Sequence, residues 1–252
     1  MKNGFDKTYE LRYFEMNRHG VASPTAILTL LEEAAAEHCH SIGYSPHILE
    51  KQNIGWVLVA GAMDMLRYPK YKESITIRTW ISKYTPVRGY RENLILDAAG
   101  KTIGKAKGIW VFYDIIKMKP TPIFDEIKEK WGVNPDLSQE VDLAGIKIIE
   151  GGEPLTEYAV HQSDIDSNRH VNNIRYFHWL IDSLPDKTSE HCFLRRIDAR
   201  FCSEAKYGEK IRVYRSEPEP DAFLHTMRSN ADNRLFVAAH SVWNMAESPD
   251  AV

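Results

Sequence analysis

Apolar residues between Ser23 and Gly43 recur at the spacing of a helix. They are Ile27, Leu30, Leu31, Ala34 and Ala35. Ser23 can cap such a helix, Pro24 suits its first turn, and Gly43 suits its end. Because apolar positions cover most of its circumference, we expect this helix to be deeply buried.

Runs with alternating, β-branched and aromatic residues follow this helix and recur after a second one. The second helix is expected to begin at Asn172 or Asn173, to bury Ile174 and Phe177, and to end at Pro185. The predicted strands cover residues 55–65, 74–83, 90–97, 102–114, 196–204, 210–216, 224–229 and 235–245. One buried helix followed by antiparallel strands predicts an α+β fold with a sheet wrapped on the helix.

Three landmarks in the first half of the chain recur in the second half. Residues 15–19 resemble residues 166–170 at an offset of 151, residues 70–77 resemble 206–213 at 136, and residues 100–110 resemble 233–243 at 133. Their conserved order indicates a duplicated unit. We therefore predict a first domain over 1–130, a linker rich in Pro and Gly over 131–152, and a second domain over 153–252.

Length and charge narrow the classes of function. The chain of 252 residues is long enough for two domains, and its net charge of −3 provides no basic field for nucleic acid. It contains no apolar run of about 18 residues, so no membrane span is expected. The charged start lacks a secretory apolar core, and three cysteines without CxxC spacing favour a reducing cytoplasm over a metal site.

The segment from Ser163 to Asn173 carries the most chemistry. In an extended stretch, Asp166, Asn168 and His170 would face the same side just before a helix begins. A carboxylate, an amide and an imidazole can supply a proton acceptor, an oxyanion donor and an orienting group for acyl transfer to water. The N–H groups at the start of the helix add donors. The same residues would also suit a loop that only caps the helix.

A second carboxylate, Glu204, ends a predicted strand whose pattern does not require it. It is either a further catalytic group or a charge facing solvent at the end of a strand. Phe201, Tyr207 and Gly208 nearby are explained by strand packing and a turn.

These two segments resemble the acyl-ACP thioesterases of plant plastids and bacteria. The family pattern D-x-N-x-H-V-N-N-x-x-Y is matched at every specified position from Asp166 to Tyr176, and Phe201, Glu204 and Gly208 are similar to a later motif. The resemblance extends from about residue 8 to residue 245. It implies a tandem (double) hotdog fold of class α+β, in which each domain is a curved antiparallel sheet around a central helix.

By this resemblance the catalytic group is Asp166, Asn168, His170 and Glu204, which would hydrolyse fatty acyl-ACP to free fatty acid and ACP in fatty acid biosynthesis. The plant enzymes carry a cysteine directly after the glutamate, whereas this chain has Ala205. An attack by water, assisted by Glu204 or His170, is therefore preferred over a thiol nucleophile. Asp166 would position the imidazole or the substrate, or would itself attack the carbonyl. A thiolate leaves readily, so we expect no metal and no cofactor.

The first half keeps Glu15, Asn17 and His19 at the same spacing but has Tyr68 in place of Glu204. We expect it to serve structure or the acyl pocket, as the first domain does in this family. Candidate lining residues are Leu28, Leu31, Ala35, Trp56 and Val59.

The partner implied by the resemblance is an acidic acyl carrier protein, which should dock on basic side chains. One candidate cluster is Arg195, Arg196, Arg200 and Lys206, and another is Arg78, Lys83, Arg88 and Arg91. A homodimer is compatible with the sequence. Three alternatives remain open: an acyl-CoA thioesterase, a dehydratase of 3-hydroxyacyl thioesters, and an acyl-binding module without catalysis.

Overall fold

The computed structural model describes residues 4–166 and 170–245. Its contacts divide the chain into unit 1, Met1–Val141, and unit 2, Asp142–Val252. In the described residues, no helix is long and apolar enough to cross a membrane. The boundaries predicted from the sequence, with a linker over 131–152, stay a prediction.

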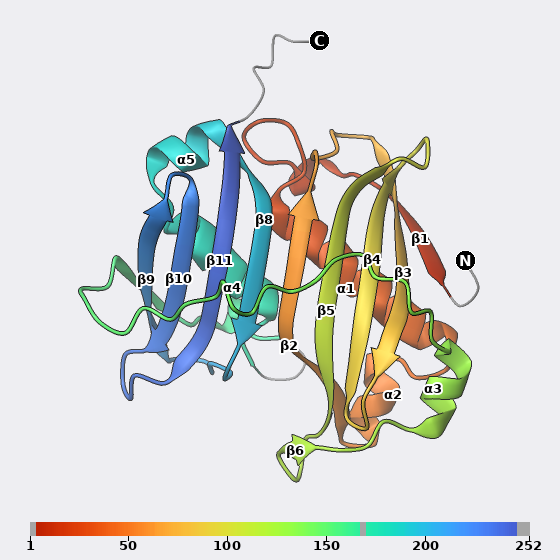
Figure 1. The fold of residues 1–252 in the computed structure, drawn as a ribbon. Coiled ribbons are helices and arrows are strands. Elements are labelled where there is room, and N and C mark those ends of the chain that lie inside the picture. The colour runs from red at the N-terminus through yellow and green to blue at the C-terminus, as the bar shows by residue number, and fades with distance from the viewer. Residues whose placement is uncertain (1–3, 167–169, 246–252) are drawn as a thin grey trace. The chain divides into compact units, whose positions relative to one another are not determined.

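Unit 1 is an antiparallel sheet with a long helix on one face (Figure 1). Its elements are β1 (Phe5–Glu10), the 3-10 helix η1 (Tyr13–Glu15), α1 (Pro24–Ser41), α2 (Pro46–Lys51), β2 (Ile54–Met65), β3 (Ser74–Tyr84), β4 (Arg88–Asp97), β5 (Thr102–Asp114), β6 (Lys119–Pro120) and α3 (Asp125–Trp131). The strands lie in the order β1, β3, β4, β5, β2, and β6 pairs with β5. The α1 helix begins as predicted: the Ser23 hydroxyl accepts a hydrogen bond from the Ala26 N–H.

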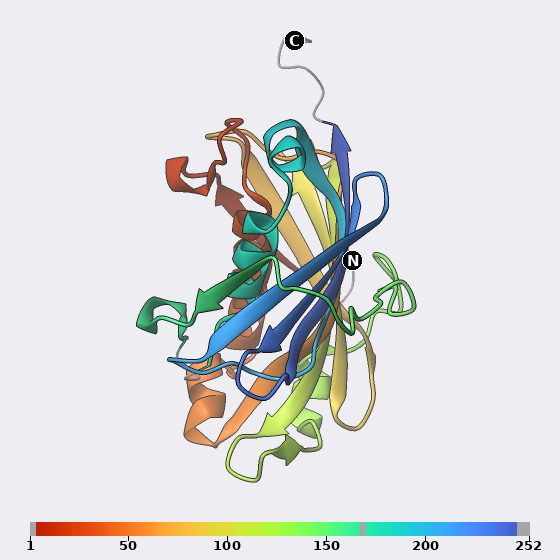
Figure 2. The same ribbon diagram turned by 90° about the vertical axis from the view of Figure 1, so that its left-hand side faces the viewer.

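Unit 2 repeats this arrangement with a shorter helix (Figure 2). Its elements are β7 (Thr156–Ala159), the 3-10 helix η2 (Gln162–Asp164), α4 (Asn173–Asp182), α5 (Asp186–His191), β8 (Cys192–Phe201), β9 (Lys210–Glu219), β10 (Ala222–Ser229) and β11 (Leu235–Met245). The strands lie in the order β8, β11, β10, β9, β7, all antiparallel. The predicted strand 196–204 is shifted: β8 ends at Phe201, and Glu204 lies in the loop beyond it.

Each unit contains the same two backbone hydrogen bonds, and these show which residues of the two units correspond. The Leu11 N–H donates to the Glu73 carbonyl in unit 1, as the Val160 N–H does to the Glu209 carbonyl in unit 2. The Ala22 N–H donates to the Pro69 carbonyl, as the Val171 N–H does to the Ala205 carbonyl. The offset is thus 149 before each central helix and 136 after it. The predicted offset of 136 agrees, whereas the predicted offset of 151 is wrong by two residues.

This correction changes which residues of unit 1 correspond to the predicted catalytic group. Asp166 corresponds to Asn17 and His170 to Val21, while Glu204 still corresponds to Tyr68. The error arose because polar residues recur at every second position in both segments. Shifting the alignment of the two segments by two residues keeps the same alternation, so the sequence pattern does not distinguish the two alignments.

The segment predicted as a linker forms hydrogen bonds with the sheets of both units. In unit 1 the Asn134 N–H donates to the Ile81 carbonyl, and the Gln139 amide donates to the Ala62 carbonyl. In unit 2 the Ile149 N–H donates to the Thr226 hydroxyl. We call residues 134–140 the strap, because they cross the face of the unit 1 sheet opposite α1 (Figure 1).

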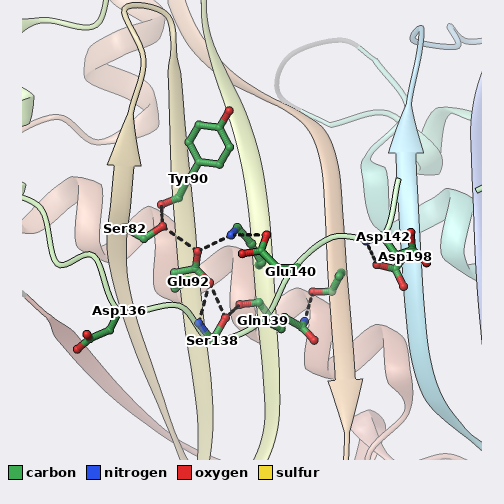
Figure 3. A network of polar contacts seen from close by, with 12 residues as sticks. Ser82, Tyr90, Glu92, Asp136, Ser138, Gln139, Glu140, Asp142 and Asp198 are labelled. Atoms are coloured by element: carbon green, nitrogen blue, oxygen red, sulfur yellow. Dashed lines mark hydrogen bonds and ion pairs between the residues drawn. The ribbon is translucent and has the colours of Figure 1, made fainter. Parts of the chain in front are cut away.

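A buried carboxylate, Glu92 on β4, anchors the strap. Its side chain is 0% exposed and accepts hydrogen bonds from the Ser82 hydroxyl at 2.8 Å and from the Ser138 N–H and hydroxyl at 3.0 and 2.6 Å (Figure 3). The ammonium of Lys107, itself buried, lies 3.0 Å away. Because every oxygen of this carboxylate is paired, the strap and the sheet are joined by a satisfied polar network.

Two buried histidines, one in each unit, make stability sensitive to acid. Burial lowers the pKa of His38 on α1 and of His225 on β10 to about 3, each well below the value of about 6.5 in an unfolded chain. Between those values the unfolded state binds more protons, so the free energy of unfolding falls as the pH is lowered from about 6.5.

We expect each histidine to cost about 1.4 kcal/mol of stability per pH unit in that range. Urea unfolding of wild type, His38→Gln and His225→Gln at pH 7.0 and 5.5 measures this. Each variant should lose less stability than wild type over that interval. An equal loss in all three proteins would show that neither imidazole is held neutral by the fold.

Candidate active site

Backbone pairing joins the two ends of the predicted catalytic segment. Ile165 and Val171 form an antiparallel bridge, and the Asp166 N–H donates to the His170 carbonyl at 3.0 Å. Asp166 and His170 are therefore opposite each other across two antiparallel backbone segments and are not positions of one extended strand. The convergence of their side chains with that of Asn168 stays a prediction. The predicted oxyanion donor Asn168 lies outside the described residues.

The structure brings His170 and Glu204 together. The Val171 N–H donates to the Ala205 carbonyl at 3.0 Å, which sets the preceding residue of each segment beside the other. As a result the His170 Nε2 lies 3.2 Å from the Glu204 Oε2. Their side chains are 26% and 45% exposed, so water has access to a pair that is joined directly.

Tyr176 on α4 holds the peptide that follows Glu204. Its buried hydroxyl accepts a hydrogen bond from the Ala205 N–H at 3.0 Å, and its ring packs edge-on against Trp179 and Phe201. Burial raises the pKa of the Tyr176 hydroxyl, which keeps the phenol neutral. The sequence contained this tyrosine as a motif position, but its contact with residue 205 follows only from the fold.

Tyr176→Phe should therefore weaken the site without emptying it. The Ala205 N–H would lose its buried acceptor, a change that typically costs about 1–3 kcal/mol and frees the backbone that positions Glu204. We expect a lower kcat with a nearly unchanged KM in thioester hydrolysis, together with a lower Tm. An unchanged kcat in a protein with a lower Tm would mean that the tyrosine serves stability alone.

The start of α4 is built by its own cap. The Asn172 side chain accepts from the Ile174 N–H at 2.8 Å, and the Asn172 carbonyl accepts from the Arg175 N–H at 2.9 Å. The sequence predicted N–H groups at this end of the helix as oxyanion donors. Two of them are already bonded within the chain and are not available for that task.

An ion pair that the sequence did not predict braces the same loop. The buried carboxylate of Asp164 lies 2.7 Å from the Arg175 Nε and accepts a hydrogen bond from the His161 N–H at 2.8 Å. Asp164 also accepts, through its carbonyl, from the Asn172 N–H. In the sequence, this ion pair is indicated only by an acidic residue before the motif and a basic residue in the first turn of α4.

The corresponding place in unit 1 lacks these groups. Val21 stands where His170 stands, and the buried Tyr68 stands where Glu204 stands. Unit 1 therefore has neither the imidazole nor the carboxylate at this position, and the candidate site belongs to unit 2.

The structure leaves only part of the two predicted basic clusters available to a carrier protein. Arg91 is 5% exposed and cannot take part in a surface cluster, so its assignment there is wrong. Arg78 pairs with Asp6, and Arg196 pairs with Asp198. Lys83, Arg88 and Lys206 remain exposed.

Two family models together match most of the chain. The model of the acyl-ACP thioesterase N-terminal domain matches residues 2–131, and that of the C-terminal domain matches residues 151–245. The chain belongs to the acyl-ACP thioesterase family. The resemblance predicted from the sequence is thereby confirmed.

Two curated relatives from plants show the extent of the match. An oleoyl-acyl carrier protein thioesterase 2 of Arabidopsis thaliana is 25% identical over 240 residues, covering 88% of this chain and 65% of the relative. An acyl-[acyl-carrier-protein] hydrolase of Cuphea viscosissima is 24% identical over 250 residues, covering 93% of this chain and 60% of the relative. The chain thus spans somewhat less than two thirds of the length of these acyl-ACP thioesterase relatives.

Solved structures agree on the fold. An acyl-ACP thioesterase from Bacteroides thetaiotaomicron matches with a TM-score of 0.88 at 21% identity, covering 96% of this chain and 98% of that chain. The 12:0-ACP thioesterase from Umbellularia californica matches with a TM-score of 0.83 at 18% identity, covering 98% and 99%. The prediction of a tandem hotdog fold of class α+β is confirmed.

Proposed function

We propose that this chain is a thiolester hydrolase that cleaves fatty acyl-ACP to free fatty acid and ACP. The observation that carries the proposal is the contact of 3.2 Å between His170 Nε2 and Glu204 Oε2, on an open loop of unit 2. Membership of the acyl-ACP thioesterase family supports both the reaction and the carrier.

The pair can move a proton in both directions during hydrolysis. A water oxygen attacks the thioester carbonyl carbon, and its proton passes to Glu204, or to His170 acting with it. The carbon–sulfur bond then breaks, and the thiolate leaves with a proton returned by the pair. One water is consumed, and the products are one carboxylic acid and one thiol.

The other predicted residues complete the proposal. Asn168 would donate to the oxyanion that forms on the carbonyl oxygen. Asp166, whose N–H is tied to the His170 carbonyl, would position the imidazole or the substrate. A thiol nucleophile after the glutamate is not part of the proposal, since residue 205 is a buried alanine.

The partner in this proposal is an acyl carrier protein that carries a fatty acyl chain. Its docking surface would include the exposed Lys206, which follows the catalytic loop, or Lys83 and Arg88 on unit 1. A cytoplasmic location and a homodimer stay predictions. The plant relatives are named as chloroplastic proteins.

Turnover of matched substrates tests the carrier and the reaction together. The purified protein is given acyl-ACP and acyl-CoA with the same acyl chain, and free thiol and free acid are counted. We expect faster release from acyl-ACP. Equal or faster turnover of acyl-CoA would replace the carrier, an enoyl product would indicate a dehydratase, and binding without thiol release would indicate an acyl-binding module.

A further inference from the structure

A guanidinium is buried inside unit 1, whereas the loop proposed for catalysis belongs to unit 2. Arg91 on β4 is 5% exposed, and its Nη1 donates to the His38 Nδ1 at 3.1 Å and to the Thr79 hydroxyl at 3.0 Å. The guanidinium carbon lies 5.0 Å from the centre of the Trp131 ring. It thus lies between the sheet, α1 and α3.

None of these neighbours carries a negative charge. The pKa of His38 is lowered to about 3 by burial and by the charge of Arg91, so the imidazole is neutral and accepts the hydrogen bond. Among the described residues, no carboxylate forms an ion pair with Arg91. Glu92, the next residue, lies on the opposite face of β4 and is paired with Lys107. A buried cation without a counter-ion is strongly unfavourable unless something else pairs with it.

Two further donors lie in the same part of the core. The Trp56 Nε1 and the Tyr84 hydroxyl are both buried without a hydrogen-bond partner in the described chain. The Trp56 ring lies 6.1 Å from the Trp131 ring at a tilt of 35°, and ring carbons of Trp56 and Tyr84 lie 3.5 and 3.6 Å from where a Cβ on Gly89 would stand. The neighbouring side chain on the same face of β4, Asn93, leaves only a neutral amide oxygen unpaired. Among the residues that the structure describes, this region is therefore rich in donors and offers Arg91 no carboxylate partner.

We propose that Arg91, Trp56 and Tyr84 form a carboxylate-binding site in the interior of unit 1. A carboxylate offers two oxygens to a guanidinium and would supply the charge that the core lacks. The ligand is either a free fatty acid or an acyl chain that ends in a second carboxyl group. All three residues belong to unit 1, whereas His170 and Glu204 belong to unit 2, and the proposal does not depend on the activity of that pair.

Binding measured by tryptophan fluorescence tests the site, because Trp56 and Trp131 lie in it. The probes are decanoate, decan-1-ol of the same length, and decanedioyl-CoA beside decanoyl-CoA. We expect decanoate to bind at least about tenfold more tightly than the alcohol. The decanedioyl thioester should exceed decanoyl-CoA by a similar factor if the second carboxyl group is the ligand, and should not if only free acids enter.

Variants decide whether Arg91 is the cause. Arg91→Met should remove the preference for the carboxylate, and Arg91→Lys should keep part of it, since a lysine retains the charge but not the fork of donors. Tyr84→Phe should weaken decanoate several-fold and leave the alcohol unchanged. His170→Ala, which lies in unit 2, should leave decanoate binding at this site as in wild type.

The thermal stability of the ligand-free protein gives a second readout. Arg91→Met should have a Tm no lower than wild type and should no longer gain Tm from decanoate. Equal binding of decanoate and decanol to wild type, or a preference for decanoate that survives in Arg91→Met, would overturn the proposal. If Arg91→Met does not fold, an unchanged decanoate affinity in Tyr84→Phe and Arg91→Lys overturns it as well.

Discussion

Removing either member of the pair in unit 2 should lower the kcat of thioester hydrolysis by at least about a hundredfold. His170→Ala deletes the imidazole, and Glu204→Gln keeps the size of the side chain but removes its capacity to take a proton. Both side chains are partly exposed, so neither change should unfold the protein. Steady-state release of thiol from acyl-ACP measures the loss, and circular dichroism confirms the fold.

Unit 1 offers matched controls for these variants. His19→Ala and Tyr68→Phe alter residues that the repeat places near the corresponding loop, where no imidazole–carboxylate pair exists among the described residues. We expect less than a threefold change in kcat for each, because neither residue belongs to the pair that is proposed to move the proton. Losses at His19 equal to those at His170 would mean that unit 1 also works, and the assignment to unit 2 would be wrong.

Glu92→Ala should destabilise unit 1 by about 3–5 kcal/mol, because it leaves the buried Lys107 without its main counter-ion. It also removes the acceptor of two hydrogen bonds from Ser138, which hold the strap to the sheet. Urea unfolding would show the loss of stability, and hydrogen exchange at residues 134–140 would show the release of the strap.

Two further variants separate the buried pair from ordinary surface charge. Glu140→Ala removes the exposed second partner of Lys107, 3.4 Å away, and should cost less than about 1 kcal/mol. The double variant Glu92→Leu with Lys107→Met should recover much of the stability lost in Glu92→Ala, because no unpaired charge remains. A double variant as unstable as Glu92→Ala would show that hydrogen bonds to the strap, and not the ion pair, dominate.

Most of the fold follows from local pattern. Strand β11 begins and ends at the predicted residues 235 and 245, and α1 begins at the predicted Pro24. These elements have a strong period and clear caps, so local preference and tertiary packing agree. The predicted strand 196–204 ran too far, because its last residues belong to a loop held from outside by Tyr176 and Val171.

The candidate site could be predicted only in part. The sequence proposed His170 and Glu204, but their contact depends on a backbone bond between residues 171 and 205, which are 34 positions apart. The roles of Tyr176 and of the Asp164–Arg175 pair likewise arise from contacts that no spacing encodes. Arg91 was assigned to the surface because a charge in a strand usually faces water, whereas here it turns toward the core.

Hydrolysis of acyl-ACP in water enriched with oxygen-18 tests the central claim most directly. If a water activated by His170 and Glu204 attacks the thioester, each fatty acid released should carry one labelled oxygen, one thiol should appear with it, and both signals should fall together in His170→Ala and Glu204→Gln. Undiminished thiol release in both variants, or an enoyl product without any free thiol, would contradict the account.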